Sequence, residues 1–381
     1  MDILIAIDSF KGSLSSLDAG NACAAGIRRV LPEAGISVWP LADGGEGTVQ
    51  ALTDGLHGRY RTVTVSDPLG RPVAAQYGIL PDGTAVIEMA AAAGLPLLAP
   101  HERDPRHTTT RGFGEMIADA LAQGCRRFLL GIGGSATNDG GIGCLQALGC
   151  MFLDGAGAPV APTAAGVAAI ETIRTDGLLP ALRDCQIRVA CDVTNPLCGE
   201  KGCSAVFAPQ KGADAAAVAE MDAALARFAV LTRQHCPDAD PDHPGAGAAG
   251  GLGFGLMAYL HADLVPGVEM VLHETGLADA VAHADLVITG EGCLDAQTAM
   301  GKAPAGVAKC AKAAGKPVIA FCGAVRPGAE ACHAVGIDAY FPIRRRIESL
   351  TDALDPVHAA SDLADTAEQA ARLLQIRLPR V

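Results

Sequence analysis

Aromatic residues are scarce in this sequence, at 4% of 381 residues with a single tryptophan, so few side chains could stack on bases. Basic residues are also outnumbered, with Lys+Arg 29 against Asp+Glu 42 and a net charge of -13. A protein that holds a polyanionic nucleic acid or an anionic membrane over its surface needs the opposite sign. The balance argues against nucleic acid and membrane as partners and favours a small-molecule substrate.

The sequence also lacks the signals of export. No stretch reaches the ~18–20 consecutive apolar residues that span a bilayer. The first residues carry no basic leader, and Asp2 and Asp8 interrupt their apolar run, so we expect no secretory signal. The 13 cysteines include no CxxC pair, and most lie among apolar residues, as buried free thiols do. We therefore expect a cytoplasmic protein.

What the sequence has in excess is glycine, 46 residues, nearly twice the usual share of roughly 7%. Glycine-rich loops allow tight turns and close approach of the backbone to a ligand. The length exceeds the ~250–300 residues at which one hydrophobic core usually divides, so two domains are expected.

Short Val/Ile/Leu runs alternate with longer Ala-rich amphipathic stretches, which predicts an α/β fold with a parallel sheet covered on both faces. The expected strands are 3–7, 37–41, 128–132, 187–191, 286–289, 318–322 and 339–343. The expected helices are 17–30, 114–121, 215–232, 304–313 and 363–374.

Residues 59–90 differ, because three strand-like runs follow one another without helices, which predicts an antiparallel patch. A nested organisation accounts for both patterns. We expect a doubly wound domain built from residues 1–62 plus 285–381, with an inserted α/β domain at residues 63–284.

Two polar loops follow predicted strands near the N-terminus. In DSFKGSLS, Lys11 lies between a strand and a helix, where free N–H groups and the helix dipole favour an anion. In ADGGEGT, two carboxylates lie on a glycine turn within reach of a metal or a substrate hydroxyl. The candidate residues of the two loops are Asp8, Ser9, Lys11 and Ser13, then Asp43, Gly44 and Glu46.

A third loop, GIGGSATNDGG, satisfies G-x-G-x-x-A after a strand, with Asp154 about 20 residues on, as in dinucleotide-binding sites. A nicotinamide-dependent dehydrogenase of a small hydroxy acid is therefore one alternative. The residues that follow, Asn138 to Gly141, are a poor start for the long helix that such a site needs. We interpret the loop as a glycine-rich anion site made by Gly133, Gly134, Ser135 and Thr137.

A fourth group lies in ACDVTNPLCG and FAPQKGA. Asp192 and Asn195 follow a buried strand, and Gln210 and Lys211 come shortly afterwards. An acid, an amide and a lysine suit either proton abstraction or metal binding beside a phosphate, and Asp192 is our candidate general base. Asp8 and Asp43 are the rival candidates for the base.

The fifth loop, TGEGCLDAQTAMGKAP, leaves a strand and enters a helix. Glu291 and Asp295 are the candidate metal ligands, and Gly290, Gln297 and Lys302 are candidate binding residues. Gly301-Lys302 is similar to a P-loop, but the first glycine and the Ser/Thr of that motif are both alanine here. Any phosphate binding must use another design.

In this order and at these spacings, the loops resemble the glycerate kinase family of bacterial class I type, over essentially the whole chain. The resemblance implies ATP-dependent phosphorylation of D-glycerate with Mg²⁺, a flavodoxin-like domain built from both termini, and an active site between the two domains. It also favours 2-phospho-D-glycerate and ADP as products, with phosphorylation of the 3-hydroxyl as the alternative.

Two other functions compete with a kinase, namely the dehydrogenase and a non-catalytic nucleotide sensor. The number of acidic residues in the glycine loops distinguishes these three functions. Neither a sensor nor a dehydrogenase needs so many acids in glycine loops, whereas a Mg-ATP site does. In a kinase, Lys11 would stabilise charge on the phosphoryl group in transfer.

Overall fold

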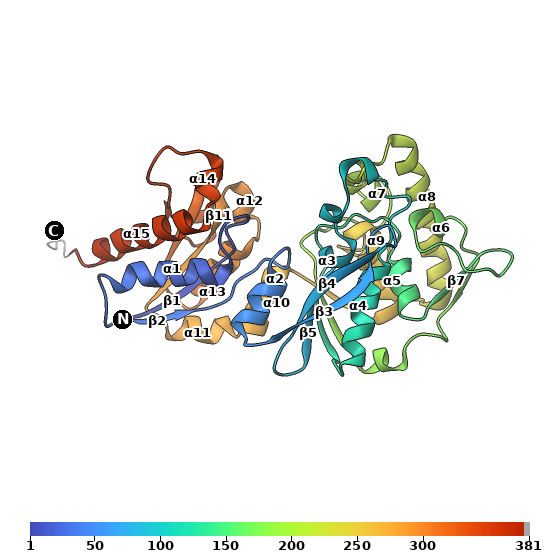
Figure 1. The fold of residues 1–381 in the computed structure, drawn as a ribbon, viewed down its shortest axis with the longest axis horizontal. Coiled ribbons are helices and arrows are strands. Elements are labelled where there is room, and N and C mark those ends of the chain that lie inside the picture. The colour runs from blue at the N-terminus through green and yellow to red at the C-terminus, as the bar shows by residue number, and fades with distance from the viewer. Residues whose placement is uncertain (377–381) are drawn as a thin grey trace. The chain divides into compact units, whose positions relative to one another are not determined.

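The computed structural model describes residues 1–376 and divides the chain into two compact units (Figure 1). Unit 1 comprises residues 1–43, 50–56 and the chain from Val268 onward, and unit 2 comprises residues 44–49 and 57–267. The changes of unit at 56/57 and 267/268 differ from the expected boundaries at 62/63 and 284/285. The reason is local, because residue 59 already begins a strand of unit 2, and helices precede residue 285 in unit 1.

Unit 1 contains one five-stranded sheet in the order β13-β12-β11-β1-β2, and all its neighbouring strands are parallel. β1 and β11 are adjacent, although more than half of the chain separates them. The carboxyl ends of parallel strands share one edge, so the loops that follow them gather there. The strands are β1 (Asp2–Ile7), β2 (Gly35–Val38), β11 (Leu286–Leu294), β12 (Val318–Val325) and β13 (Ala339–Pro342).

Helices cover both faces of this sheet. Along β1, Ile3, Ile5 and Ile7 pack into one apolar cluster with α1 and α15, whereas Leu4 and Ala6 pack into another with α11 and α13. Alternate side chains of a strand point to opposite faces, so the continuous apolar run of β1 is a consequence of double burial. The helices are α1 (Ser16–Arg28), α10 (Gly267–Thr275), α11 (Leu277–His283), α12 (Ala296–Ala299), α13 (Ala303–Ala313), α14 (Leu350–Leu354) and α15 (Pro356–Leu374).

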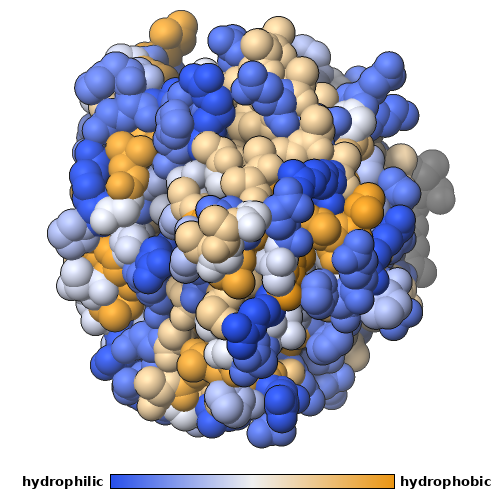
Figure 2. Space-filling view, turned by 90° about the vertical axis from the view of Figure 1, so that its right-hand side faces the viewer, coloured by the Kyte–Doolittle hydropathy of each residue, from blue (hydrophilic) through white to orange (hydrophobic). Residues whose placement is uncertain are grey.

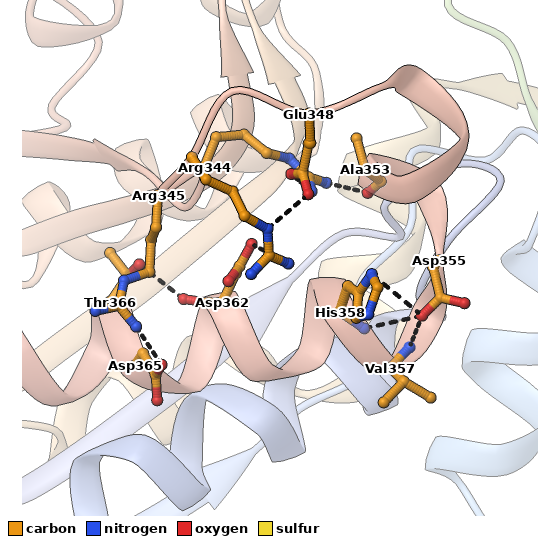
Figure 3. Close-up of polar contacts among 11 residues, drawn as sticks. Arg344, Arg345, Glu348, Ala353, Asp355, Val357, His358, Asp362, Asp365 and Thr366 are labelled. Atoms are coloured by element: carbon orange, nitrogen blue, oxygen red, sulfur yellow. Dashed lines mark hydrogen bonds and ion pairs between the residues drawn. The ribbon is translucent and has the colours of Figure 1, made fainter.

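Ion pairs hold the segment between β13 and α15 (Figure 3). Arg344 donates to the Glu348 carboxylate at 2.8 Å and to the carbonyl of Ala353. Arg345 pairs with Asp365 on α15. Asp355 caps α15, because its Oδ1 accepts the N–H groups of the helix's first turn. Charged contacts therefore define the path of this segment.

Unit 2 contains a six-stranded mixed sheet in the order β10-β9-β6-β5-β4-β3. β10, β9, β6 and β5 are parallel, whereas β3, β4 and β5 form an antiparallel meander. The antiparallel patch expected for residues 59–90 is thereby confirmed. The strands are β3 (Arg59–Ser66), β4 (Pro72–Ile79), β5 (Thr84–Glu88), β6 (Arg127–Gly131), β9 (Gln186–Ala190) and β10 (Asp263–Val265), with β7 (Met151–Leu153) and β8 (Thr172–Arg174) as a separate pair.

The core of unit 2 includes an aromatic cluster of Phe152, Phe228, Phe254 and Tyr259, with ring centroids 5.9–6.4 Å apart. The buried hydroxyl of Tyr259 lies 3.0 Å from that of Thr232, so its polar end is satisfied. The helices are α3 (Ala90–Ala93), α4 (Arg111–Ala122), α5 (Ile142–Ala147), α6 (Ala164–Val167), α7 (Cys203–Phe207), α8 (Ala215–His235) and α9 (Ala248–Leu260), while α2 (Thr48–Gly55) crosses the boundary between the units.

The structure is α/β, as predicted, and the expected helices are all present with bounds that differ by a few residues. The strand expected at 37–41 is observed at Gly35–Val38. Leu41 instead follows the strand, where its N–H donates to the Ser16 hydroxyl at 2.9 Å. None of the helices described here is both long enough and apolar enough to cross a bilayer. The face in Figure 2 shows hydrophobic groups interrupted by hydrophilic residues.

Candidate active site

In unit 1, Asp8 and Glu291 are brought together by the pairing of β1 with β11. Ile7 is in register with Gly290, and the N–H of Asp8 donates to the Gly290 carbonyl at 2.9 Å. Asp8 therefore directly follows β1, beside Glu291, which lies within the adjacent parallel strand β11. Both are largely buried, at 6% and 8% exposed respectively.

Burial raises the pKa of Asp8 to about 7, and the nearby carboxylates of Asp43 and Glu291 act in the same direction. The N–H of Ser9, which donates to Asp8 Oδ1 at 2.7 Å, and the charge of Lys11 lower the pKa and offset part of this effect. A carboxyl group with a pKa near neutrality can accept and release a proton under physiological conditions.

Lys11 lies on a tight loop that closes on itself. Phe10 and Leu14 exchange two backbone hydrogen bonds, at 2.8 and 3.0 Å, and Gly12 takes the left-handed conformation, with φ +77°, that the turn requires. The Lys11 ammonium is 3.9 Å from Asp43 Oδ2 and is otherwise exposed. Ser13 Oγ is buried without a hydrogen-bond partner among residues 1–376, which leaves it able to bind a ligand.

The N-terminus of α1, where the sequence predicts an anion site, is capped by the chain's own side chains. Ser15 caps the helix by accepting the N–H of Asp18 at 3.1 Å, and its hydroxyl donates to the Asp18 carboxylate at 2.6 Å. The chain's own acid therefore already interacts with the positive end of the helix dipole. The side chain of Lys11, rather than the helix, is the cationic feature of this loop.

Glu291, Asp295 and Lys302 form the second part of the unit 1 site. Lys302 Nζ lies 4.0 Å from Glu291 Oε2 and 4.0 Å from Asp295 Oδ1. Glu291 Oε1 accepts the Thr298 hydroxyl at 2.5 Å, and burial raises the pKa of Glu291. Asp295 caps α12 by accepting the N–H groups of Gln297 and Thr298.

Residues 1–376 contain no group of three or more His, Cys, Asp or Glu side chains arranged to hold a metal ion. Mg²⁺ is commonly held by one or two carboxylates together with phosphate oxygens and water. Glu291 Oε2 and Asp295 Oδ2 accept no hydrogen bond shown by the structure, so this pair fits that requirement.

Two further predicted binding residues in this loop have different surroundings. Gln297 is exposed on α12. Gly290 is buried within β11, where a Cβ atom would lie 2.0 Å from the Phe321 carbonyl of β12. Glycine at this position is therefore explained by the packing of adjacent strands.

In unit 2, the loop 44–49 is held by Glu88, a residue that the sequence analysis did not select. Its Oε1 accepts the N–H of Val49 at 2.7 Å, and burial raises its pKa. Gly44 has φ +85° and lies so close to Ala190 and Gly267 that any side chain would clash. Glu46 is exposed on this loop. The sequence offers a reason to select Glu88, because this acid lies in one of the strand-like runs predicted within residues 59–90.

The loop after β6 does not continue into a dinucleotide-binding helix. The next helix, α5, begins only at Ile142 and spans six residues. Asp154 lies in a tight turn after β7, where its carboxylate accepts the N–H groups of Ala156 and Ala158. The geometry therefore does not support the dehydrogenase alternative. Gly133 and Gly134 are exposed at the tip of the loop, whereas Thr137 is fully buried.

Lys211 reaches this loop from the short helix at residues 209–211. Its ammonium donates to Ser135 Oγ at 2.8 Å and to the Thr137 carbonyl at 2.6 Å. The side chain is only 2% exposed, and burial lowers its pKa to about 8. The neighbouring Gln210 points to solvent and is exposed. The sequence analysis groups Lys211 with Asp192 and Asn195 and does not connect it with this loop.

A buried acid holds the other side of the same loop. Asp139 is fully buried and accepts hydrogen bonds from the N–H and hydroxyl of Thr110 at 2.9 and 2.8 Å, and from the N–H groups of Gly141 and Gly143. Asn138 donates to the Ser204 hydroxyl at 2.9 Å. The sequence analysis quoted these residues in a motif but did not assign them a role.

Asp192, the predicted base, is exposed, and its Oδ1 accepts the N–H of Gly267 at the start of α10 at 2.9 Å. Asn195 donates to the Lys201 carbonyl at 2.8 Å and so stabilises its own loop. Both residues therefore have structural contacts, and both are less buried than Asp8.

A family model described as the glycerate kinase family matches residues 3–375. The chain belongs to the glycerate kinase family. It is 47% identical to the glycerate kinase of Haemophilus influenzae, covering 99% of this chain and 100% of that protein. It is 46% identical to the glycerate 2-kinase of Escherichia coli, over 93% of each chain.

A crystal structure from Salmonella typhimurium LT2, described as a glycerate kinase 2, has a TM-score of 0.91 to this chain at 45% identity, covering 98% of both. The family resemblance expected from the loops is thereby confirmed. Within this chain, unit 1 carries one group of polar side chains and unit 2 carries another.

The raised pKa of Asp8 predicts a dependence of stability on pH. The native state holds this proton more tightly than the unfolded chain, whose pKa is near the ordinary 3.8, so its contribution is lost as pH rises from about 4 to about 7. Relative to Asp8→Asn, the wild-type free energy of unfolding should fall by on the order of 1–3 kcal/mol across this range.

Denaturant unfolding of both proteins at several pH values measures this difference. Glu33→Gln, at an exposed acid, is the matched control and should show a difference from wild type that does not change with pH. A constant difference between wild type and Asp8→Asn would show that Asp8 has an ordinary pKa.

Proposed function

We propose that this protein transfers the γ-phosphoryl group of ATP to D-glycerate and gives 2-phospho-D-glycerate and ADP. The observation that carries the proposal is the cluster of Asp8, Lys11, Asp43, Glu291 and Lys302 around the carboxyl ends of β1 and β11. Phosphoryl transfer depends on positioning and on charge stabilisation, which lysines and metal-binding acids supply. Membership of the glycerate kinase family supports the choice of reaction.

Mg²⁺ would be held by Glu291 and Asp295, together with phosphate oxygens. When bound, it would neutralise charge on the phosphates during transfer. Lys302 lies beside both acids and would contact the same phosphates, while Lys11 would approach from the loop after the adjacent strand β1. The buried, unpartnered Ser13 Oγ is a further donor for a phosphate oxygen.

For the general base, the surroundings favour Asp8 over the Asp192 of the sequence-based prediction. Asp8 is buried with a pKa of about 7, whereas Asp192 is exposed and caps α10. In a loose transition state the base acts mainly by aligning the hydroxyl and accepts the proton late. Asp43, whose Oδ2 lies 3.9 Å from the Lys11 ammonium, is the third candidate.

Three finer features belong to the same proposal. The order β2-β1-β11-β12-β13 corresponds to 2-1-3-4-5, which supports a flavodoxin-like unit 1 with its ligand crevice at the switch point between β1 and β11. The two units support a nested arrangement in which the middle of the chain is an inserted domain. All 13 cysteines are free thiols, which supports a cytoplasmic enzyme.

The test of the function is ADP release from ATP with D-glycerate, run beside an absorbance assay with NADH. Phosphorylation of the 2-hydroxyl gives a product that enolase consumes directly, whereas the 3-phosphate first requires a mutase. ADP release that needs D-glycerate and Mg²⁺ supports the proposal. Absence of glycerate-dependent ADP release would refute it.

Lys11→Ala should lower kcat by on the order of 10²-fold, because the exposed ammonium stabilises charge that develops during transfer. The melting temperature should stay close to wild type, since the side chain is exposed and its one ion pair among residues 1–376, with Asp43, is long at 3.9 Å. Lys309→Ala, at an exposed lysine of α13, is the matched control. Steady-state kinetics measures kcat for both variants. Near-normal turnover in Lys11→Ala would argue against a role of Lys11 in charge stabilisation.

Replacing Glu291 by Gln or Asp295 by Asn should raise the Mg²⁺ concentration needed for half-maximal activity, by about tenfold or more. A hard dication prefers charged oxygen ligands, and the amides keep the size of the side chains. Activity titrated against Mg²⁺ gives the midpoints, with Glu330→Gln as the control at another acid of unit 1. Unchanged midpoints in both variants count against these ligands.

The base can be identified by comparing Asp8→Asn, Asp43→Asn and Asp192→Asn. Loss of the base should lower kcat by about 10²–10⁴-fold while ATP still binds. We expect Asp8→Asn to lose most turnover and to retain calorimetric ATP binding. If Asp192→Asn loses more turnover than Asp8→Asn, the proton goes to the loop after β9 instead.

A further inference from the structure

The tip of the loop after β6 presents backbone donors that nothing in the described chain satisfies. The N–H groups of Gly133 and Gly134 have no acceptor among residues 1–376, and both residues are exposed. Gly134 has φ +71°, and a left-handed residue at such a turn aims successive N–H groups toward the same point. Concave groups of backbone N–H donors of this kind bind anions.

Ser135 adds a hydroxyl to these donors. Its oxygen accepts a hydrogen bond from Lys211 at 2.8 Å, so its own hydrogen is free to donate to a ligand. Lys211 is too deeply buried to meet a ligand in solvent, at 2% exposed, and it acts through Ser135 and the Thr137 carbonyl. Lys211 is therefore a positioning residue that also places a positive charge behind the loop.

The charge of this site suits a singly charged anion. Lys211 supplies one positive charge to this site, and no carboxylate in the described chain lies within ion-pair distance of Lys211. The buried Asp139 is close enough to influence the pKa of Lys211 and offsets part of its charge. The unit 1 site differs, because it combines Lys11 and Lys302 with several acids, as a Mg-triphosphate requires.

From this difference we infer that the Gly133–Ser135 loop, positioned by Lys211, binds the carboxylate of the acceptor, D-glycerate. The inference rests on the proposed function for the identity of the acid. The loop would bind through the N–H groups of Gly133 and Gly134 and the Ser135 hydroxyl, and so select substrates that carry a carboxylate next to the hydroxyl-bearing carbon. A phosphate of ATP is the other oxyanion that could occupy the loop.

Selection follows from charge. An analogue without the carboxylate, such as glycerol, offers no anionic acceptor to the two N–H groups and no negative charge to interact with the Lys211 ammonium. The wild-type enzyme should therefore bind glycerol far more weakly than D-glycerate. Loss of the positive charge behind the loop should weaken binding of the acid and leave glycerol unaffected.

The experiment measures binding by calorimetry for D-glycerate, glycerol and Mg-ATP separately, so that it does not depend on turnover. The variants are Lys211→Met and Ser135→Ala, and Lys201→Met, at an exposed lysine ten residues away, is the matched control. We expect Lys211→Met to raise the Kd for D-glycerate by on the order of 10–100-fold and Ser135→Ala by about tenfold. The Kd for Mg-ATP should change by less than about twofold.

Kinetics separates this role from a purely structural one. Lys211→Met should raise the KM for D-glycerate much more than it lowers kcat, whereas a general loss of structure would lower kcat and the melting temperature together. If Lys211→Met does not fold, Ser135→Ala, which keeps the lysine, decides the question.

Three results overturn the inference: unchanged glycerate binding in both variants, a larger loss for Mg-ATP than for D-glycerate, or equal binding of glycerol and D-glycerate by wild type. The second result assigns the loop to phosphate. These outcomes are separate from the proposed function, which fails if wild type binds D-glycerate without phosphorylating it and stands if wild type phosphorylates it while both variants bind normally.

Discussion

The parallel pairing of β1 with β11 is the contact on which the rest of unit 1 depends. It joins strands from the two ends of the chain along five registered positions, from Ile3 with Leu286 to Ile7 with Gly290. Because the strands run in the same direction, the residues that follow them emerge at one edge of the sheet. Asp8, directly after β1, lies beside Glu291 of β11, and the carboxylate of Glu291 helps to raise the pKa of Asp8.

On its other side β11 packs closely against β12. Gly290 and Gly323 have no room for a Cβ atom, since each faces the backbone of the neighbouring strand. The apolar residues of β1 are covered on both faces, so its hydrogen bonds are shielded from water. A rigid sheet of this kind lets short loops hold polar side chains in fixed positions, which charge stabilisation during phosphoryl transfer requires.

In unit 2, two buried charged side chains hold a loop in place. In unit 1, the charged side chains lie at one edge of the sheet. Lys211 and Asp139 hold the two halves of one loop from inside, each through hydrogen bonds to backbone and hydroxyl groups. Burying a charge is costly unless it is well bonded. Here both buried charges are hydrogen-bonded, and these bonds hold a loop whose exposed tip consists of backbone N–H donors. Such donors need no reorganisation when a ligand arrives.

The sequence by itself determined the α/β class, most helices and strands, the antiparallel patch and the glycine loops that carry the family resemblance, because these features depend on local periodicity and short motifs. Only the tertiary structure decided the strand order, the pKa of Asp8, the burial of Lys211 and the contacts of Glu88 and Asp139. It also decided that Ser15 and Asp18 cap α1 and that Asp192 caps α10. The physical reason is that each of these properties depends on neighbours distant in the chain, and local patterns do not encode which strands pair or which polar groups lose contact with water.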